Sequence, residues 1–309
     1  MVALPMGARA DIATVETFRD STTSEAESLR SQAMRSAEGF GVTQDWTAAL
    51  DCLQRAAELG HSMAQAELAA LSRNWSAAHA IVAGKKLPPS ACEELRRSID
   101  LTHWLAPPPH KVIVSASPRI AVVEAFAPPE VCDWLIERAR PRLVPAQVYD
   151  HDSGEARSRN VRTNSECHFR ADESDFVLLL VCARIAAVTG LPVGAMEATA
   201  ILHYTPGQKF EPHHDFLDTS IPGYAKAVAR GGQRVLTFLL CLNDEYEGGE
   251  TDFPMIGKRY KGHKGNAVFF WNVEPDGTPD KRTLHAGLPP TRGEKWLLSQ
   301  WVRGRVSRG

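Results

Sequence analysis

The segment "EATAILHYTPGQKFEPHHDF" (residues 197–216) begins a change in the pattern of this sequence. From there onward the chain consists of short strand-like stretches separated by Gly, Pro, Asn and Asp. The later stretches are "QRVLTFLLCLND" (233–244), "GNAVFFWNV" (265–273), "KRTLHAGL" (281–288) and "EKWLLSQWVRG" (294–304). Several short strands at this spacing predict a β-sandwich or a β-barrel.

Helical stretches precede this strand-rich region. "APPEVCDWLIERARPRL" (127–143) has proline near its start, which is typical of a first helical turn. "DFVLLLVCARIAAVTG" (175–190) reads as a second helix that ends at its glycine, and "RIAVVEAF" (119–126) reads as a strand. We expect both helices to pack on the outside of the sheet, so the predicted class is α+β.

The N-terminal part is rich in alanine and has a helical period from about Glu25 to Leu71. Residues 39–68 resemble the Sel-like repeat, a relative of the tetratricopeptide repeat. The matching positions are Gly39, Gly41, Val42, Asp45, Ala48, Ala56, Ala57, Gly60 and Ala64. One good repeat and part of another are present, whereas such repeats usually stack in threes or more. We expect this one to pack against something else, and an ordinary helical hairpin is the alternative.

A proline run, "APPPHK" (106–111), interrupts the helical pattern, because consecutive prolines cannot continue a helix. The sequence therefore predicts four segments. They are a loose N-terminus (1–22), a helical repeat region (23–105), a proline-rich linker (106–116) and a second domain (117–305).

Composition excludes several classes of partner. The chain has 309 residues, 43% of them hydrophobic, and a net charge of −2, so no basic surplus favours nucleic acid or an anionic membrane. No apolar run approaches the roughly 20 residues of a membrane helix, and the start shows no secretory signal pattern. Six cysteines lie far apart without a CxxC motif, which argues against a disulfide framework or a zinc knuckle. We expect a reducing, cytoplasmic location.

A candidate metal site lies in "EPHHDF" (211–216). Residues i and i+2 of a strand share a face, so His213 pairs with Asp215, while His214 is expected on the outer face and partly exposed. His285, on a later predicted strand, is the third candidate. Two histidines and one carboxylate with open positions opposite them form the facial triad of non-haem iron(II) oxygenases. A closed tetrahedral site would indicate structural zinc instead, and each histidine alone could be an ordinary core or surface residue.

Lys295 follows His285 by ten residues, and the turn-rich "GLPPTRGE" (287–294) between them predicts adjacent antiparallel strands. By the period of two, Lys295 shares a strand face with Trp301. A lysine aimed into a barrel is unfavourable unless it is paired. A dicarboxylate cosubstrate would pair it, with its other end on the metal. A solvated lysine at the start of a strand is the alternative.

The segment from about Arg119 to Arg303 resembles the catalytic domain of prolyl 4-hydroxylases, within the 2-oxoglutarate- and iron(II)-dependent dioxygenases. The matching motifs are "RTN" (162–164), "HYTPGQKFEPHHDF" (203–216), "GGQRVLTFLLCLNDEYEGGETDFP" (231–254), "KGNAVFFWN" (264–272) and "LHAGLPPTRGEKW" (284–296). They occur in the family's order. The resemblance implies a double-stranded β-helix, a cupin-like jelly roll, with flanking helices.

The resemblance also implies roles for individual residues. The positions that match the iron ligands are His213, Asp215 and His285. The positions that match the binding site for the distal carboxylate of 2-oxoglutarate are Lys295, Tyr204 and Thr251. The positions that match the lining of the peptide channel are Arg162, Arg234 and Trp301. Thr237 is either an ordinary strand threonine or a contact to the cosubstrate.

Two positions depart from the family pattern, namely Phe210 where tyrosine is frequent and Asn164 where serine is common. Both face the substrate in the family, so they bear on peptide specificity more than on iron chemistry. The long segment "LDTSIPGYAKAVARGG" (217–232) has glycine near both margins and is a candidate lid.

The function implied by the resemblance is hydroxylation of a prolyl residue in a peptide or protein. The enzyme would use Fe(II), 2-oxoglutarate and O2, with ascorbate as an optional cofactor, and would release succinate and carbon dioxide. One alternative is hydroxylation of a free amino acid or another small metabolite by the same chemistry. Another is a non-catalytic binding module in which the helical repeat is the working surface. In the catalytic interpretation the repeat could hold a protein partner.

Overall fold

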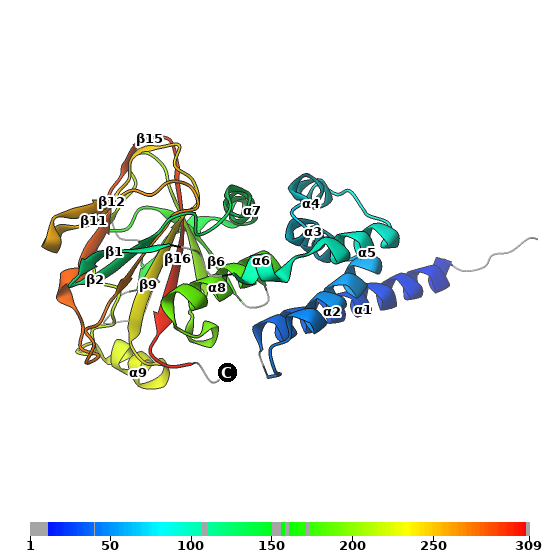
Figure 1. Cartoon of the computed structure of the whole chain (residues 1–309), viewed down its shortest axis with the longest axis horizontal. Helices are drawn as coiled ribbons and strands as arrows, with labels where there is room; N and C mark the ends of the chain where they lie inside the picture. Colours follow the sequence, from blue (N-terminus) through cyan, green and yellow to red (C-terminus); the bar gives the residue numbers. More distant parts are fainter. Residues whose placement is uncertain are drawn as a thin grey trace, which may run out of the picture. The chain divides into compact units, whose positions relative to one another are not determined.

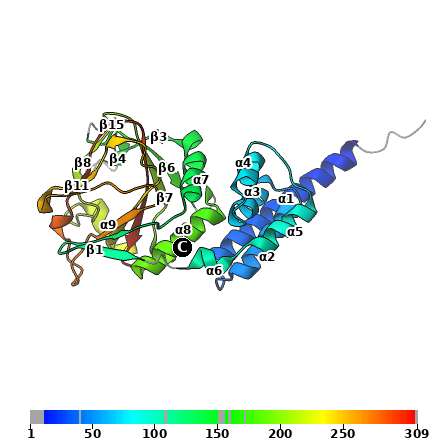
Figure 2. The same ribbon diagram turned by 45° about the horizontal axis from the view of Figure 1, so that its top comes forward.

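The computed structural model describes residues 12–39, 41–106, 110–149, 156–157, 161–170 and 173–306 (Figures 1 and 2). The chain divides into two compact units. The first contains the described residues up to Trp104 together with Asp175–Leu179. The second contains Leu105–Ser174 and the described residues from Leu180 onward.

The first unit is helical, as the alanine-rich period predicted. Its helices are α1 (Ile12–Glu38), α2 (Trp46–Glu58), α3 (Ser62–Leu71), α4 (Trp75–Val82), α5 (Pro89–Ser98) and α6 (Leu101–Leu105). Asp45 caps α2 by accepting hydrogen bonds from the N–H groups of Thr47 and Ala48, each at 2.9 Å. The inward face of α2, with Leu50 and Leu53, is fully buried. The likeness to the Sel-like repeat stays a prediction.

A buried ion pair explains why a piece of a later helix belongs to the first unit. The Glu67 carboxylate is fully buried and accepts two hydrogen bonds from the Arg30 guanidinium, at 2.7 and 3.1 Å. It also accepts one from the backbone N–H of Phe176, at 3.3 Å. A buried carboxylate requires such partners, so the first turn of α8 (Phe176–Thr189) is tied to the helical unit.

Two predicted segment boundaries differ from the structure. Helix α1 begins at Ile12, so residues 12–22, expected to be loose, are helical, while residues 1–11 lie outside the described residues. Residues 111–116, expected to be linker, form strand β1 (Lys111–Ala116), which pairs with β2 (Arg119–Val123). The β-branched run Val112–Val114 favours a strand, and the proline run hid this signal. Residues 107–109 lie outside the described residues.

The second unit is built around an antiparallel sheet of eight strands. Their spatial order is β1-β2-β13-β9-β16-β7-β6-β3. The bounds of those not yet given are β3 (Val144–Pro145), β6 (Ser165–Phe169), β7 (Thr199–Tyr204), β9 (Arg234–Cys241), β13 (Ala267–Trp271) and β16 (Lys295–Arg303). The strands expected near 119, 199, 234, 267 and 295 are therefore all present.

A smaller antiparallel sheet faces the large one across a common interior, which Figures 1 and 2 show from two directions. Its order is β12 (Lys258–Tyr260), β11 (Thr251–Phe253), β14 (His285–Gly287) and β8 (Phe210–His213). Two short ribbons pair β10 (Glu247–Gly248) with β15 (Pro290–Arg292) and β4 (Val148–Tyr149) with β5 (Ala156–Arg157). Side chains of both sheets, among them Leu239, Phe270 and Phe253, form one apolar cluster. This arrangement is the predicted jelly roll.

Helices flank this barrel. Figures 1 and 2 both place α7 (Pro129–Ala139) and α8 beside the large sheet. A third helix, α9 (Pro222–Gly231), occupies the middle of the candidate lid segment 217–232, where no helix was expected. Short 3-10 turns of the unit include Arg140–Arg142, Val193–Ala195, Pro254–Ile256 and Lys281–Thr283. Within the described ranges, no helix combines the length and apolarity that crossing a membrane requires.

Candidate active site

The three candidate metal ligands meet at one edge of the small sheet. His213 is the last residue of β8, Asp215 lies in the bend directly after it, and His285 is the first residue of β14. Strands β8 and β14 are antiparallel neighbours, and His213 lies directly opposite His285. Cross-strand partners have side chains on the same face. The three candidates meet as expected, but Asp215 reaches the site from the bend beyond β8 and not from a strand position as inferred from "EPHHDF".

The ligand atoms of this triad converge. All three lie within 4.8 Å of one another, and the Nε2 atoms of His213 and His285 lie 3.6 and 3.4 Å from the Asp215 carboxylate oxygens. On the opposite ring edges, Nδ1 of His213 lies 2.8 Å from the Glu211 carbonyl, and Nδ1 of His285 lies 3.0 Å from the Thr283 carbonyl. A carbonyl can only accept, so each Nδ1 donates and each Nε2 keeps its lone pair for a metal.

The charge state of the triad suits a divalent metal. Burial and the nearby His285 lower the pKa of His213 to about 3, so its imidazole is neutral at physiological pH. Burial alone would raise the pKa of Asp215. The neighbouring His285 and His213 and the hydrogen bond from Thr237 outweigh it, and the pKa is lowered. Neutral imidazoles and an ionised carboxylate are the forms that coordinate metal.

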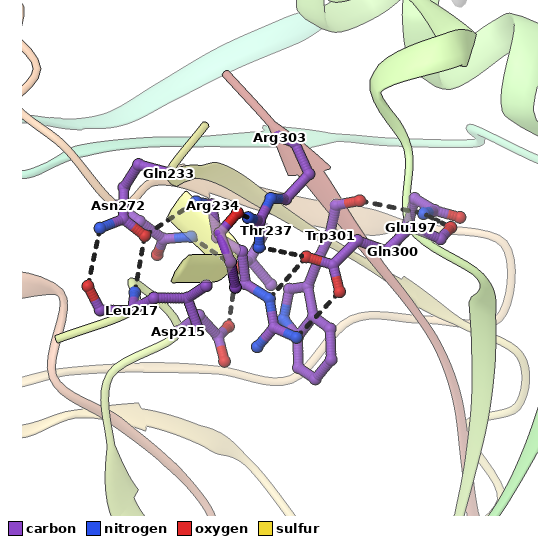
Figure 3. A network of polar contacts seen from close by, with 11 residues as sticks. Glu197, Asp215, Leu217, Gln233, Arg234, Thr237, Asn272, Gln300, Trp301 and Arg303 are labelled. Carbon is purple, nitrogen blue, oxygen red and sulfur yellow. Dashed lines mark hydrogen bonds and ion pairs between the residues drawn. The ribbon is translucent and has the colours of Figure 1, made fainter. Parts of the chain in front are cut away.

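Thr237 has a different task from the two considered on sequence grounds. Its hydroxyl donates to Asp215 Oδ2 at 2.7 Å, and it accepts a hydrogen bond from the Asn272 side-chain amide at 2.9 Å (Figure 3). All three side chains are buried. Because the Asn272 amide occupies an acceptor site of the hydroxyl, the hydroxyl proton is directed to the carboxylate. Thr237 is thus a positioning residue for the metal-binding Asp215.

Replacing Thr237 with valine is expected to weaken iron binding by about 10–100-fold, because outer partners of metal ligands typically contribute that much. Valine keeps the shape of threonine and removes the hydrogen bond to Asp215. Iron retained after dialysis against graded chelator measures the effect. Thr237→Ser, which keeps a hydroxyl, serves as the matched control and should retain most of the affinity. Equal iron affinity in the valine variant and the wild type would contradict this role.

Gln233 fixes the backbone that follows Asp215 in the sequence. Its side-chain amide accepts from the Leu217 N–H at 2.6 Å and donates to the Leu217 carbonyl at 2.8 Å (Figure 3). These two bonds replace a rung of a β-ladder and close the base of the segment that carries α9. The backbone two residues beyond Asp215 is therefore fixed.

The proposed cosubstrate residues line the same cavity as the triad. Lys295 starts β16 and lies opposite Tyr204, the last residue of β7, while Thr251 starts β11 of the facing sheet. All three are at most 5% exposed and line the cavity that contains the triad. The Lys295 ammonium donates to the Gly249 carbonyl at 2.7 Å and lies 5.2 Å from the centre of the Tyr204 ring.

The Lys295 ammonium determines which chemical group can bind beside it in the cavity. Burial lowers the pKa of Lys295 to about 8, which leaves it mostly protonated at neutral pH. An ammonium carries three donors, whereas the Gly249 carbonyl accepts one. Burial also raises the pKa of Tyr204 to about 12, so this phenol stays a donor. A buried cation with spare donors fits a carboxylate, which is the distal group of 2-oxoglutarate.

His285 and Lys295 do not lie on neighbouring strands, contrary to the expectation from "GLPPTRGE". The segment contains an additional strand, β15, which pairs with β10. It carries the chain from β14 in the small sheet to β16 in the large one. The two residues consequently face the same cavity from opposite walls. This arrangement would place the metal triad and the proposed carboxylate anchor at opposite ends of a bound 2-oxoglutarate.

The proposed substrate residues take different positions. Arg162 and Trp301 line the cavity with the triad. The Arg162 guanidinium lies 4.7 Å from the centre of the Phe210 ring, which itself stacks on the His213 ring at 3.5 Å. Arg162 also bonds to Asn164 at 3.1 Å and to Glu166. Both positions that depart from the family pattern, Phe210 and Asn164, are therefore direct neighbours of Arg162.

Arg234 is the one proposed site residue that lies behind the cavity wall. Its guanidinium lies 3.6 Å from the Trp301 ring centre and makes two hydrogen bonds to the Glu197 carboxylate, at 2.7 and 2.8 Å (Figure 3). It fixes the orientation of Trp301. The Trp301 indole N–H is buried and has no hydrogen-bond partner among the described residues. His214 points away from the triad, as expected, and its Nε2 lies 3.0 Å from the Lys281 carbonyl.

The residues present fit an iron ion and 2-oxoglutarate, because the triad offers three convergent ligand atoms and Lys295 offers an incompletely bonded buried ammonium. The sequence suggested Thr237 only as a possible contact to the cosubstrate, and it did not reveal Asn272, Gln233 and Glu197 as members of the site. No local signal marks them, since each acts through a partner from another strand or loop.

Comparisons with known proteins agree with this geometry. Residues 199–303 match the family described as the 2OG-Fe(II) oxygenase superfamily. "Prolyl 4-hydroxylase 1" of Arabidopsis thaliana is 37% identical over 209 residues, which cover 63% of this chain and 72% of that protein. "Probable prolyl 4-hydroxylase 3" of the same plant is 34% identical over 62% and 71%. A viral collagen prolyl hydroxylase from Paramecium Bursaria Chlorella virus-1, in its 2OG complex, is 27% identical, with a TM-score of 0.46 over 59% of this chain and 94% of that one.

Proposed function

Because the chain belongs to the prolyl 4-hydroxylase family within the 2OG-Fe(II) oxygenase superfamily, we propose that it hydroxylates a prolyl residue in a peptide or protein. The protein is a 2-oxoglutarate-dependent dioxygenase that uses Fe(II), 2-oxoglutarate and O2. The non-catalytic interpretation is thereby excluded. The use of ascorbate stays a prediction.

The chain's own residues orient the reactants. His213, Asp215 and His285 would hold the iron, and Lys295 with Tyr204 and Thr251 would hold the distal carboxylate of 2-oxoglutarate. Bound iron with 2-oxoglutarate and O2 supplies the oxidising chemistry that converts a C–H group to C–OH, with release of succinate and carbon dioxide. The apolar wall of Leu239, Leu297 and Phe210 keeps bulk water away from the reacting atoms.

The observation that carries the proposal is that Arg162 and Trp301 line the same cavity as the metal triad. A peptide across the cavity mouth needs donors for its backbone carbonyls and an apolar wall for the proline ring. Arg162 is a donor, and Trp301 offers both a ring face and an unpartnered indole N–H. Incubation of cell proteins and proline-containing peptides with the enzyme, followed by mass spectrometry, tests it. A gain of one oxygen atom on proline is the expected result.

Trp301→Ala is expected to lower kcat/KM for a proline-containing peptide by about thirtyfold or more, because a buried tryptophan anchor typically contributes 2 kcal/mol or more to binding. Peptide-independent conversion of 2-oxoglutarate to succinate should fall far less, since Trp301 contacts neither Lys295 nor the triad through any hydrogen bond. Parallel assays of peptide oxidation and succinate measure the two effects. If Trp301→Ala and Arg162→Ala both turn over the true substrate as fast as the wild type, the peptide interpretation is wrong. The substrate would then be a small metabolite.

The small-metabolite alternative is favoured by one observation. Phe210 covers the His213 ring where family members frequently have tyrosine, so no phenolic donor lies there for a peptide or for its new hydroxyl group. A screen of free amino acids for oxygen incorporation distinguishes the two substrate classes.

The cellular location and a protein partner are further proposals. We propose a cytoplasmic location, which the free state of all six cysteines supports, each lying within the described ranges. We also propose that the helical unit holds a protein partner, in keeping with its repeat-like sequence. Affinity capture with the wild-type protein and with a variant changed at exposed residues of the helical unit would test this proposal. A partner bound by the wild type and lost in the variant would support it.

A further inference from the structure

A second hollow lies beyond the end of strand β16, outside the cavity described above. This groove measures about 1200 Å³ and is lined by residues of α9, the segment before β7 and the end of β16, including Glu197, Ala227, Arg230, Arg303 and Arg305. Strand β16 begins at the cosubstrate anchor Lys295 and passes Trp301 before it reaches the groove. The groove therefore lies at the opposite end of this strand from Lys295.

The groove carries a positive charge that its own residues do not neutralise. Its single lining carboxylate, Glu197, accepts two hydrogen bonds from Arg234 and one from Arg303 at 3.2 Å. Arg230 and Arg305 also line the groove, and neither has a carboxylate partner among the described residues. The groove lining thus holds one carboxylate and three guanidinium groups, and the carboxylate is also bound by Arg234 from outside the lining, which favours an anionic ligand.

The arginines are held in place at the groove wall. Arg303 donates to the Ala227 carbonyl at 2.7 Å, and Arg305 donates to the Ala229 carbonyl at 3.3 Å, so both fasten helix α9 to the end of β16. Gly232 permits this close approach, since it has φ +77° and a Cβ there would lie 3.0 Å from the Arg305 nitrogen. A guanidinium has five N–H donors. One bond to a helix carbonyl leaves donors of Arg305 for a carboxylate.

The groove is joined to the iron cavity by one continuous set of side chains. Trp301 lines the cavity, Arg234 lies on its ring, and Glu197 binds Arg234 and lines the groove (Figure 3). An extended chain that places a proline near Trp301 spans about 3.3 Å per residue. Arg303 stands two residues beyond Trp301 on β16, so a substrate chain that runs along this strand would reach the groove within a few residues.

We propose that this groove binds acidic residues that flank the target proline, so that the substrate is a polypeptide with Asp or Glu a few residues to one side of it. The inference rests on the proposed function and deepens it. Arg230 and Arg305 pair with the acidic side chains, while Arg303 and Arg234 keep the wall in place through Glu197.

The test compares three versions of one proline-containing peptide that the enzyme oxidises. One version carries an Asp-Glu run at one end, one carries the run at the other end, and one carries Asn-Gln instead. We expect one acidic version to have a KM about tenfold below that of the neutral version at low salt, since two exposed ion pairs together account for about that factor. The preference should shrink as salt rises, because added ions screen exposed charges.

The double variant Arg230→Gln/Arg305→Gln should bring the ratio of the two KM values to about one. Arg259→Gln, on strand β12 and away from the groove, should leave the ratio as in the wild type. The charge-reversed variant Arg230→Glu/Arg305→Glu should prefer a peptide with a Lys-Arg run. Thermal unfolding of each variant identifies a loss of folding, and the charge-reversed preference can be measured even if stability falls.

Two failures are distinguishable. Equal KM values for all three peptides with the wild type, or an unchanged ratio in the double variant, would overturn the groove proposal and leave prolyl hydroxylation intact. Absence of oxygen incorporation on proline in every peptide, while a free amino acid or another metabolite is oxidised, would overturn the proposed function and the groove proposal with it.

Discussion

Alanine at His213, Asp215 or His285 is expected to abolish iron-dependent conversion of 2-oxoglutarate to succinate, by about a thousandfold or more. The three ligand atoms lie within 4.8 Å of one another, and each would supply one bond to the metal. Loss of one of these side chains weakens iron binding and leaves the other two buried side chains without that neighbour. Several kcal/mol of metal-derived stabilisation correspond to at least that factor in rate. Succinate release and the iron content of the dialysed protein measure the two effects.

His214 offers a matched control for these three changes, because it is the same side chain one residue away from a proposed ligand. Its Nε2 lies 3.0 Å from the Lys281 carbonyl, away from the triad. His214→Ala should therefore keep most of the activity and the iron. An inactive His214→Ala together with an active His213→Ala would show that the strand register is wrong.

Part of the metal triad could be predicted from the sequence, because two of its three residues are close neighbours in the chain. His213 and Asp215 are separated by one residue, and the strand alternation that paired them depends only on backbone geometry, although in the structure Asp215 lies in the bend beyond β8. The pairing of His213 with His285 depends on sheet register, and 72 positions in the sequence separate them, since 285 − 213 = 72. Chemistry and the family resemblance suggested the third ligand, and the tertiary structure fixed its position.

The residues that support the site could not be predicted in the same way. Thr237 reads as an ordinary strand residue, and its bonds to Asp215 and Asn272 join segments 22 and 35 residues away. Glu197 and Arg234 are likewise 37 residues apart. Such contacts depend on which strands become neighbours, and a single sequence contains no direct record of that.

Two topological details were missed for different reasons. The segment between β14 and β16 is rich in turn residues whether it forms a hairpin or crosses between sheets, so composition could not show strand β15. Helix α9 did have a signal. Pro222 stands at its first position, three alanines follow within the helix, and Gly232 ends it. The length of the segment drew attention to a lid instead.

The proposed anchor for 2-oxoglutarate is the second position where we expect one side chain to decide function. Lys295 is 3% exposed, and its ammonium has one hydrogen bond, to the Gly249 carbonyl. Gly249 has φ +71°, and a Cβ there would lie 2.9 Å from the Tyr246 ring, so glycine is needed to present that carbonyl. The cavity thus keeps a cation in apolar surroundings, where a carboxylate binds more strongly than in water.

Lys295→Met is expected to raise the KM for 2-oxoglutarate by about two to three orders of magnitude, because a buried carboxylate that loses its charged partner is destabilised by about 3–5 kcal/mol. Methionine has a similar length, so packing against Tyr204 is retained.

The pKa of Lys295, about 8, adds a test by pH. The ammonium is charged below that value and neutral above it, so the wild-type KM should be flat below pH 8 and rise above it, whereas the variant should show no such rise. Lys258→Met, at an exposed lysine of strand β12, is the control and should behave as the wild type. Succinate formation at graded 2-oxoglutarate and pH gives all of these values, and an unchanged KM in Lys295→Met would remove this residue from the site.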